Sequence, residues 1–169
     1  MEILDLGQLT DRQRAELEGA EDDPFDGAGV SLRFRPKDRH VAMRDAAGRL
    51  VASAGLTVAE VEVADQRIPV VGLGGVIVNA DHRRRGLARQ IVEEALDRAR
   101  TMGPPFAILF CHADRVGLYA RLAFVEIDDT VSVEQPDGFA PMPMRTMWRA
   151  LHADASWPDG PVRVHSLPF

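Results

Sequence analysis

A strand, a basic turn, a helix and a second strand follow one another in the middle of the chain, and this order constrains the fold more than any other feature. Val70–Val78 is apolar and rich in β-branched residues, which is typical of a buried strand. Apolar residues then recur at helical spacing over Leu87–Ala99, and Gly103 followed by two prolines ends that pattern. Phe106–Cys111 is a second apolar strand. Strands that alternate with a helix predict an α/β fold.

The turn between the first strand and the helix has the chemistry of an anion site. Arg83, Arg84 and Arg85 precede Gly86, where the predicted helix begins. The first amides of a helix have no partner within it, and the helix dipole places partial positive charge there. Glycine lets the backbone approach a ligand closely, and arginines supply forked donors that suit phosphate. The turn therefore predicts a binding site for a pyrophosphate.

Two motifs in this region resemble those of a known enzyme family. Arg83-x-x-Gly86-x-Ala88 resembles the Q/R-x-x-G-x-G/A signature of the GCN5-related N-acetyltransferases (GNATs), which hold the pyrophosphate of acetyl-CoA in this way. Tyr119-x-x-x-x-Phe124 resembles the family's Tyr-x-x-x-Gly-Phe box, with Ala123 in place of the glycine. The resemblance covers nearly the whole chain. It implies one domain over residues 1–169 with the GNAT fold, an α/β arrangement in which helices flank a mixed, mostly antiparallel sheet of six to seven strands with a splayed central strand pair.

The resemblance also implies which residues bind acetyl-CoA, the expected cosubstrate. Its pyrophosphate would lie against the turn and helix start, made of Arg83, Arg84, Arg85, Gly86, Leu87, Ala88 and Arg89. Glycines within the preceding strand indicate a bulge, and the family splays this strand so that amides at Val76, Ile77 and Val78 bind the pantetheine arm. The Val76 amide would also polarise the acetyl carbonyl. His112, where many relatives have asparagine, would orient the arm.

Acetyl transfer to an amine needs a proton for the leaving thiolate and a neutral attacking amine. The resemblance implies that Tyr119, the only tyrosine, contacts the cofactor and acts as the general acid. Many relatives carry a basic glutamate on the strand before the turn, but residues 70–78 contain no carboxylate. The general base therefore stays open, with several candidates: Glu60, Glu62, Asp81, His82 and His112.

Two other chemistries are disfavoured by the sequence. Cys111 and His112 are adjacent on a strand and would point to opposite faces, which disfavours an acetyl-enzyme route. The five histidines are scattered without ligand spacing, so we expect no metal.

Composition bounds the partners and the compartment. The net charge of −6 disfavours nucleic acid, whose phosphates are bound by basic surfaces. No apolar run is long enough to span a membrane, and a single cysteine suits a reducing compartment. We therefore expect a cytoplasmic protein with no membrane partner, and a homodimer stays open.

Three features bear on the acceptor. Asp22, Asp23 and Asp26 follow the first predicted helix, where the family borders its acceptor site, and would attract an amine; a solvated loop is the alternative. The ending from Trp157 to Gly160 is similar to the W-x-x-G tail of aminoglycoside 2′-N-acetyltransferases, and Trp157 is a candidate wall of the acceptor pocket. Gly74, at the position of a glutamate in those enzymes, is a further candidate acceptor-site residue.

The sequence thus predicts an N-acetyltransferase. It would transfer an acetyl group from acetyl-CoA to a primary amine of a small molecule, by direct attack in a ternary complex. An enzyme that uses a longer acyl-CoA or a peptide amine is one alternative. A non-catalytic, CoA-binding sensor with the same fold is another.

Overall fold

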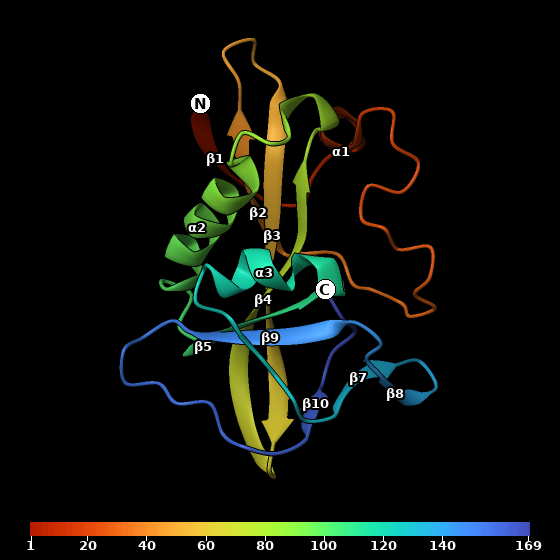
Figure 1. The fold of residues 1–169 in the computed structure, drawn as a ribbon, viewed down its shortest axis with the longest axis vertical. Helices are drawn as coiled ribbons and strands as arrows, with labels where there is room; N and C mark the ends of the chain where they lie inside the picture. Colours follow the sequence, from red (N-terminus) through yellow and green to blue (C-terminus); the bar gives the residue numbers. More distant parts are fainter.

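Two long strands form the spine of the sheet. A computed structural model describes all 169 residues, and in it β3 (Leu50–Val63) and β4 (Gln66–Val78) make an antiparallel hairpin (Figure 1). β5 (Phe106–Cys111) runs parallel to β4, and β2 (Arg39–Arg44) runs antiparallel to β3. Both faces of these central strands are covered, which explains why their sequences are apolar at nearly every position.

The complete sheet has ten strands in the order β6-β9-β5-β4-β3-β10-β7-β8, and β2 and β1 extend it from β3. The remaining strands are β1 (Glu2–Leu6), β6 (Val125–Glu126), β7 (Val131–Gln135), β8 (Gly138–Pro141), β9 (Arg145–Ala150) and β10 (Val162–Val164). Only the β4–β5 and β10–β7 pairs are parallel. The mixed, mostly antiparallel α/β sheet is confirmed. It has more strands than predicted, and the unexpected ones include β8 and β10, which are only four and three residues long and carry little periodic signal.

Three α-helices flank the sheet. They are α1 (Asp11–Glu18), α2 (Leu87–Ala99) and α3 (Val116–Ala120), with 3₁₀ turns η1 (Ala80–His82) and η2 (Ala113–Arg115). The predicted apolar stripe of α2 is buried, and it packs on β2, β3 and β4. Thr10 caps α1 in a capping box with Gln13. None of the helices has both the length and the apolar character needed to cross a bilayer.

The core consists of a main cluster on each side of the sheet. On the α2 face, Val71 and Leu73 of β4 join the apolar stripe of α2. On the opposite face, which we call the Phe169 face, Phe110 and Phe169 pack with ring centroids 5.0 Å apart. Gly72 also belongs to this face, because a β-carbon added there would lie 2.4 Å from the Phe169 ring.

Candidate active site

β4 and β5 separate near their carboxyl ends. Their pairing runs from Val70 with Phe106 to Leu73 with Leu109 and then stops, although β4 continues to Val78. The register of β4 against β3 also shifts here, and Gly75 adopts a left-handed conformation with φ of +58°. This bulge turns β4 away from β5, so its backbone beyond Leu73 has no strand partner on that side. The splayed central pair expected from the sequence is confirmed, and we call the part of the sheet beyond Leu73 and Leu109, where β4 and β5 no longer pair, the opening.

Free backbone amides gather at the turn after β4. No carbonyl or side chain of the protein accepts a hydrogen bond from the amides of residues 84–88, and α2 has no side-chain cap. Arg84 and Gly86 are both left-handed, with φ of 61° and 76°. Left-handed residues in such a turn direct successive N–H groups into one concavity, which favours an anion. A β-carbon on Gly86 would meet nothing within 4 Å, so this concavity is open.

The arginines of the turn divide into paired and unpaired groups. The two terminal nitrogens of the Arg83 guanidinium, Nη1 and Nη2, donate to the Glu21 carboxylate, and its Nε donates to the Val78 carbonyl at 3.1 Å. Arg89 pairs with Glu93 at 2.9 Å. Arg84 and Arg85 are exposed and make no ion pair. Arg84 and Arg85 therefore supply unpaired positive charge beside the free amides. Arg83 instead connects the turn to the loop after α1.

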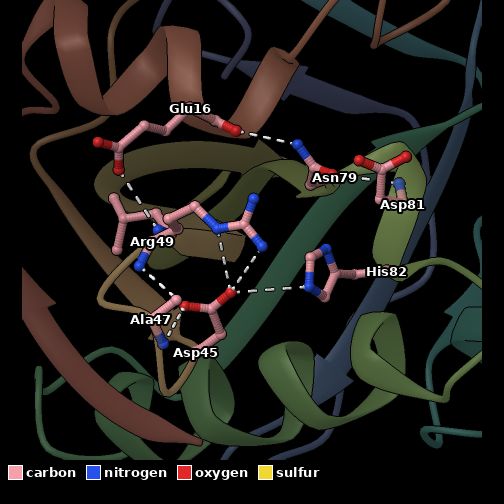
Figure 2. Close-up of polar contacts among 8 residues, drawn as sticks. Glu16, Asp45, Ala47, Arg49, Asn79, Asp81 and His82 are labelled. Carbon is pink, nitrogen blue, oxygen red and sulfur yellow. Dashed lines mark hydrogen bonds and ion pairs between the residues drawn. The ribbon is translucent and has the colours of Figure 1, made fainter.

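A polar cluster fixes the start of the turn (Figure 2). The Asn79 side chain donates to the Glu16 carbonyl at 3.0 Å and accepts from the Asp81 amide at 3.1 Å. Asp45 caps the β2–β3 hairpin by accepting from the Ala47 and Arg49 amides, each at 2.9 Å. The Leu50 amide of the hairpin donates to the Glu16 carboxylate at 3.4 Å, and His82 of η1 lies 3.9 Å from Asp45. Contacts among α1, the hairpin and η1 therefore set the position of the amide concavity.

Tyr119 and Cys111 lie together under the opening, on the α2 face. Tyr119 is buried and packs edge-on against Phe124, with ring centroids 5.9 Å apart. Burial, aided by the charge of Cys111, raises the pKa of Tyr119 to about 12. Burial likewise raises the pKa of the Cys111 thiol to about 11. At neutral pH the tyrosine therefore keeps its proton, and the cysteine is a thiol with little nucleophilic character.

His112 lies at the end of β5, where the strands have parted. Its Nε2 is buried and has no hydrogen-bond partner in the protein. Asp23 is close enough for its charge to interact with His112. The Asp23 carboxylate is itself occupied, since it accepts from the Gly27 and Ala28 amides at 2.9 Å each, and the Gly27 bond is the largest cause that lowers its pKa. The acidic loop is thus held in shape by Asp23 and approaches the opening at His112.

The other residues predicted to contact the acceptor do not all lie near the opening. Asp22 and Asp26 are exposed on the same loop as Asp23. Gly74 lies at the opening, on the Phe169 face. Trp157 does not lie there: it stacks on Trp148 at 5.5 Å and packs edge-on against Phe106, at the opposite end of β5. The structure therefore brings Gly74 and the acidic loop toward the opening and leaves Trp157 partly buried against the core at the other end of β5.

The candidates for a general base also separate. Glu60 pairs with Arg67, and Glu62 contacts Arg67 and His165, all toward the β3–β4 turn. Because β3 rises about 3.3 Å per residue, these carboxylates lie well away from the opening at Gly55 and Gly74.

The remaining two candidates, Asp81 and His82, lie in the 3₁₀ turn η1 that follows β4. The Asp81 amide donates a hydrogen bond to the Asn79 side chain, and His82 faces Asp45, with its Nε2 3.9 Å from the Asp45 Oδ2 (Figure 2). His112 is the only candidate that ends at the splay.

The absence of a carboxylate on β4 has a steric reason. A β-carbon on Gly74 would lie 2.6 Å from the carbonyl carbon and oxygen of Phe169. The space that a side chain would need is therefore filled by the backbone of Phe169.

We expect Gly74→Ala to lower the free energy of unfolding by about 1–3 kcal/mol, because the added methyl overpacks a backbone contact. Chemical denaturation of both proteins measures the change. Gly117→Ala is the matched control, since a β-carbon there meets nothing within 4 Å and the residue lies in α3. Equal stability of the Gly74 variant and the wild type would mean that Phe169 does not cross β4 at this position.

Ala123 adopts the conformation of the glycine that it replaces in the Tyr-x-x-x-Gly-Phe box. Its φ is 60°, and the following Phe124 amide donates to the Tyr119 carbonyl at 3.1 Å. We expect Ala123→Gly to stabilise the protein by about 0.5–1 kcal/mol, because relief of left-handed strain exceeds the added chain entropy. Ala120→Gly, within α3, should have the opposite sign. Thermal unfolding measures both shifts, and a lower melting temperature for Ala123→Gly would contradict the strain.

Sequence reasoning missed Lys37. Its side chain reaches the bulge, since a β-carbon on Gly75 would lie 3.4 Å from Cε and 3.7 Å from Nζ. Burial lowers the pKa of Lys37 and is the sole cause of that shift. The available signal was that Lys37 is the only lysine among 20 lysine and arginine residues.

A cradle of amides beside an opening in a sheet suits a nucleotide diphosphate that carries a long arm. The acetyltransferase (GNAT) domain family matches residues 19–125, which span the acidic loop, the cradle and Tyr119. The chain belongs to the GNAT acetyltransferase family, whose members are acetyl- and acyltransferases. The finer resemblance to aminoglycoside 2′-N-acetyltransferases is not confirmed. No curated protein matches the sequence.

Solved structures of this fold align over almost the whole chain. A GNAT family N-acetyltransferase (YhbS) from Escherichia coli, in complex with CoA, has a TM-score of 0.63 at 20% identity and covers 96% of this chain and 89% of its own. A GNAT family acetyltransferase from Brucella melitensis, in complex with acetyl-CoA, has a TM-score of 0.59 at 15% identity, over 97% and 96%. A putative acyl-CoA N-acyltransferase from Klebsiella pneumoniae has a TM-score of 0.63 at 18% sequence identity, and the alignment covers 89% of this chain and 97% of that one. These likenesses establish the fold.

Proposed function

We propose that this protein is an acetyl-CoA-dependent N-acetyltransferase that acts on a primary amine of a small molecule. The observation that carries the proposal is the adjacency of two features, the unpaired amides of residues 84–88 and the end of β4–β5 pairing at Leu73 and Leu109. The first suits a diphosphate, and the second leaves backbone groups of β4 without a strand partner, available to a thioester arm. Two structural relatives are described with CoA and acetyl-CoA, which supports this choice of cosubstrate.

In this proposal the residues from Arg83 to Arg89 have different roles. The amides from Arg84 to Ala88 bind the diphosphate oxygens, and the unpaired guanidinium groups of Arg84 and Arg85 add charge. Arg83 acts by position, since Glu21 and the Val78 carbonyl occupy its side chain. The Arg89 side chain, paired with Glu93, stands at the rim of the cradle.

The strand and the tyrosine carry the chemistry. Beyond Leu73 the peptide groups of Val76, Ile77 and Val78 align the pantetheine arm, and the Val76 amide donates to the carbonyl oxygen as negative charge develops there. Tyr119 holds a proton at neutral pH and gives it to the departing sulfur. The attacking amine loses its proton to water or to His112, whose buried Nε2 has no other partner.

The acceptor approaches from the Phe169 face, because Tyr119 and α2 occupy the other side of the opening. Asp22, Asp23 and Asp26 border this approach and attract an ammonium group. The Lys37 amine lies on the same face, and whenever it is protonated it repels acceptors that carry several positive charges, which favours an amine with little further charge. A cytoplasmic location and the absence of nucleic-acid and membrane partners remain part of the proposal, which rests there on composition.

The test is a panel of amines screened for thiol release from acetyl-CoA. The panel holds amino acids, monoamines, aminoglycosides and a short peptide, and each is repeated with a longer acyl-CoA. We expect turnover with a small monoamine and intersecting initial-rate lines, which indicate direct attack in a ternary complex. Parallel lines would indicate an acetyl-enzyme instead. CoA binding without turnover on any acceptor would favour a sensor.

A further inference from the structure

Lys37 is held at the bulge of β4 by the segment that precedes β2. The Arg35 amide donates to the Pro168 carbonyl at 2.8 Å, and the Asp38 amide donates to the Leu56 carbonyl at 3.0 Å. The Thr57 hydroxyl donates to the Asp38 carboxylate. These bonds on both sides of Lys37 fix its backbone over β3, so its side chain has one direction in which to extend.

Glycines clear the path of the Lys37 side chain. A β-carbon on Gly55 would lie 2.3 Å from Lys37 Cγ, and one on Gly74 would lie 3.0 Å from Cε. Any other residue at Gly55 would therefore displace the lysine. With these positions empty, the amine reaches Gly75, next to the Val76 amide that is proposed to hold the acetyl carbonyl.

The amine is not used to bind another group of the protein. Lys37 forms no ion pair and no hydrogen bond, and burial alone lowers its pKa. Three polar groups border it. His40 has a pKa that is lowered mainly by burial and further by Lys37, and the Asp38 carboxylate is taken by Thr57 and Arg35. The third is the main-chain carboxyl group of Phe169, which lies against the Gly74 position beside Lys37 Cε but forms no ion pair with the lysine. A neutral amine is the form that attacks a thioester, and this site favours it.

We propose that Lys37 is a self-acetylation site, which accepts the acetyl group of bound acetyl-CoA when no amine acceptor occupies the opening. The inference rests on the proposed cosubstrate. The lysine nitrogen forms a bond to the acetyl carbon, and the carbon–sulfur bond breaks. The products are Nε-acetyl-lysine and CoA thiol: the sulfur takes a proton from Tyr119, which recovers one from the attacking nitrogen through solvent.

Acetylation changes the acceptor side of the opening in two ways. It removes the basic amine that reaches the bulge, and it leaves an amide of larger size against Gly74 and Gly75. An acetylated protein should therefore accept small amines more slowly, and an acceptor present in excess should protect Lys37. Self-acetylation would thus report a high ratio of acetyl-CoA to acceptor.

The chain suits a direct test, because any acetyl-lysine on it must be Lys37. The full-length protein is incubated with acetyl-CoA that carries a deuterated acetyl group. Intact mass and peptide mapping then follow label on Lys37 and on the amino terminus, and calorimetry measures CoA binding to the same preparation. We expect saturable labelling of Lys37, at least about 100-fold faster than in the Gly86→Glu variant, because binding holds the two groups together.

The controls separate this inference from the proposed function. Lys37→Arg keeps a positive charge and should bind CoA but take no label on the mapped peptide. If CoA binds to the wild type and Lys37 is unlabelled, or is labelled as fast in Gly86→Glu, the self-acetylation proposal is wrong. If neither CoA binding nor labelling occurs, the proposed function itself fails.

Discussion

Gly86→Glu should abolish the binding of CoA, with an affinity loss of more than about 100-fold. Gly86 is left-handed at the start of α2, and the space beside it is open, so a glutamate would project into the proposed diphosphate site. A carboxylate about 4 Å from a phosphate costs roughly 4 kcal/mol at an effective dielectric constant of about 20, and each ~1.4 kcal/mol is tenfold in affinity. Titration calorimetry with CoA measures the loss.

Gly103→Glu is the matched control for this variant. Gly103 follows α2 at its other end, has φ of 106° and also has nothing within 4 Å of an added β-carbon. The substitution introduces the same charge and similar backbone strain, of about 1–2 kcal/mol, without touching the cradle. We expect Gly103→Glu to have a lower melting temperature than the wild type and to bind CoA with the same affinity. Equal CoA affinity in Gly86→Glu would show that the cradle is not the diphosphate site.

Tyr119→Phe should lower kcat by about 100-fold or more while the affinity for acetyl-CoA changes little. General acid catalysis contributes about 10²–10⁴ to rates, and phenylalanine retains the ring that packs on Phe124. Because the Tyr119 pKa is raised to about 12, the wild-type enzyme keeps this proton throughout the range from pH 7 to about 10. Its rate should therefore show no alkaline decline from Tyr119 in that range.

Steady-state kinetics with the best acceptor of the panel, at several pH values, test this assignment. Thermal unfolding and CoA calorimetry of the variant show whether its fold and cosubstrate site are intact. An unchanged kcat would remove Tyr119 as the acid. A fall in kcat that comes with an equal loss of CoA affinity would instead make it a binding residue.

The central elements were predictable because their signals are local. Leu87–Ala99 and Phe106–Cys111 appear in the structure with the predicted bounds, since an apolar stripe with a glycine–proline stop and a short apolar run are each complete within a few residues. The short strands β8 and β10 were not predicted. β10 is placed between β3 and β7 by distant partners, and three residues of sequence cannot specify that choice.

In the candidate site, too, features made of contiguous residues could be predicted and contacts between distant segments could not. The cradle could be inferred because Gly86 and its arginines are contiguous. Contacts between distant segments could not: the pairing of Arg83 with Glu21, the Phe169 backbone at Gly74 and the reach of Lys37 to Gly75 depend on how loops cross the sheet. The packing of Trp157 on Trp148 and Phe106 could not be inferred for the same reason, since an aromatic residue in a tail fits a core and a pocket wall equally well.

The most direct test of the diphosphate cradle compares CoA with pantetheine by calorimetry on the wild-type protein. Pantetheine keeps the thiol arm but lacks the diphosphate. Because each hydrogen bond to a charged group contributes about 1.5–3 kcal/mol, several amides should make CoA bind at least about 100-fold more tightly. Saturable CoA binding with pantetheine weaker by that factor is the predicted result. Absence of heat with CoA, or equal affinity for the two molecules, would contradict it.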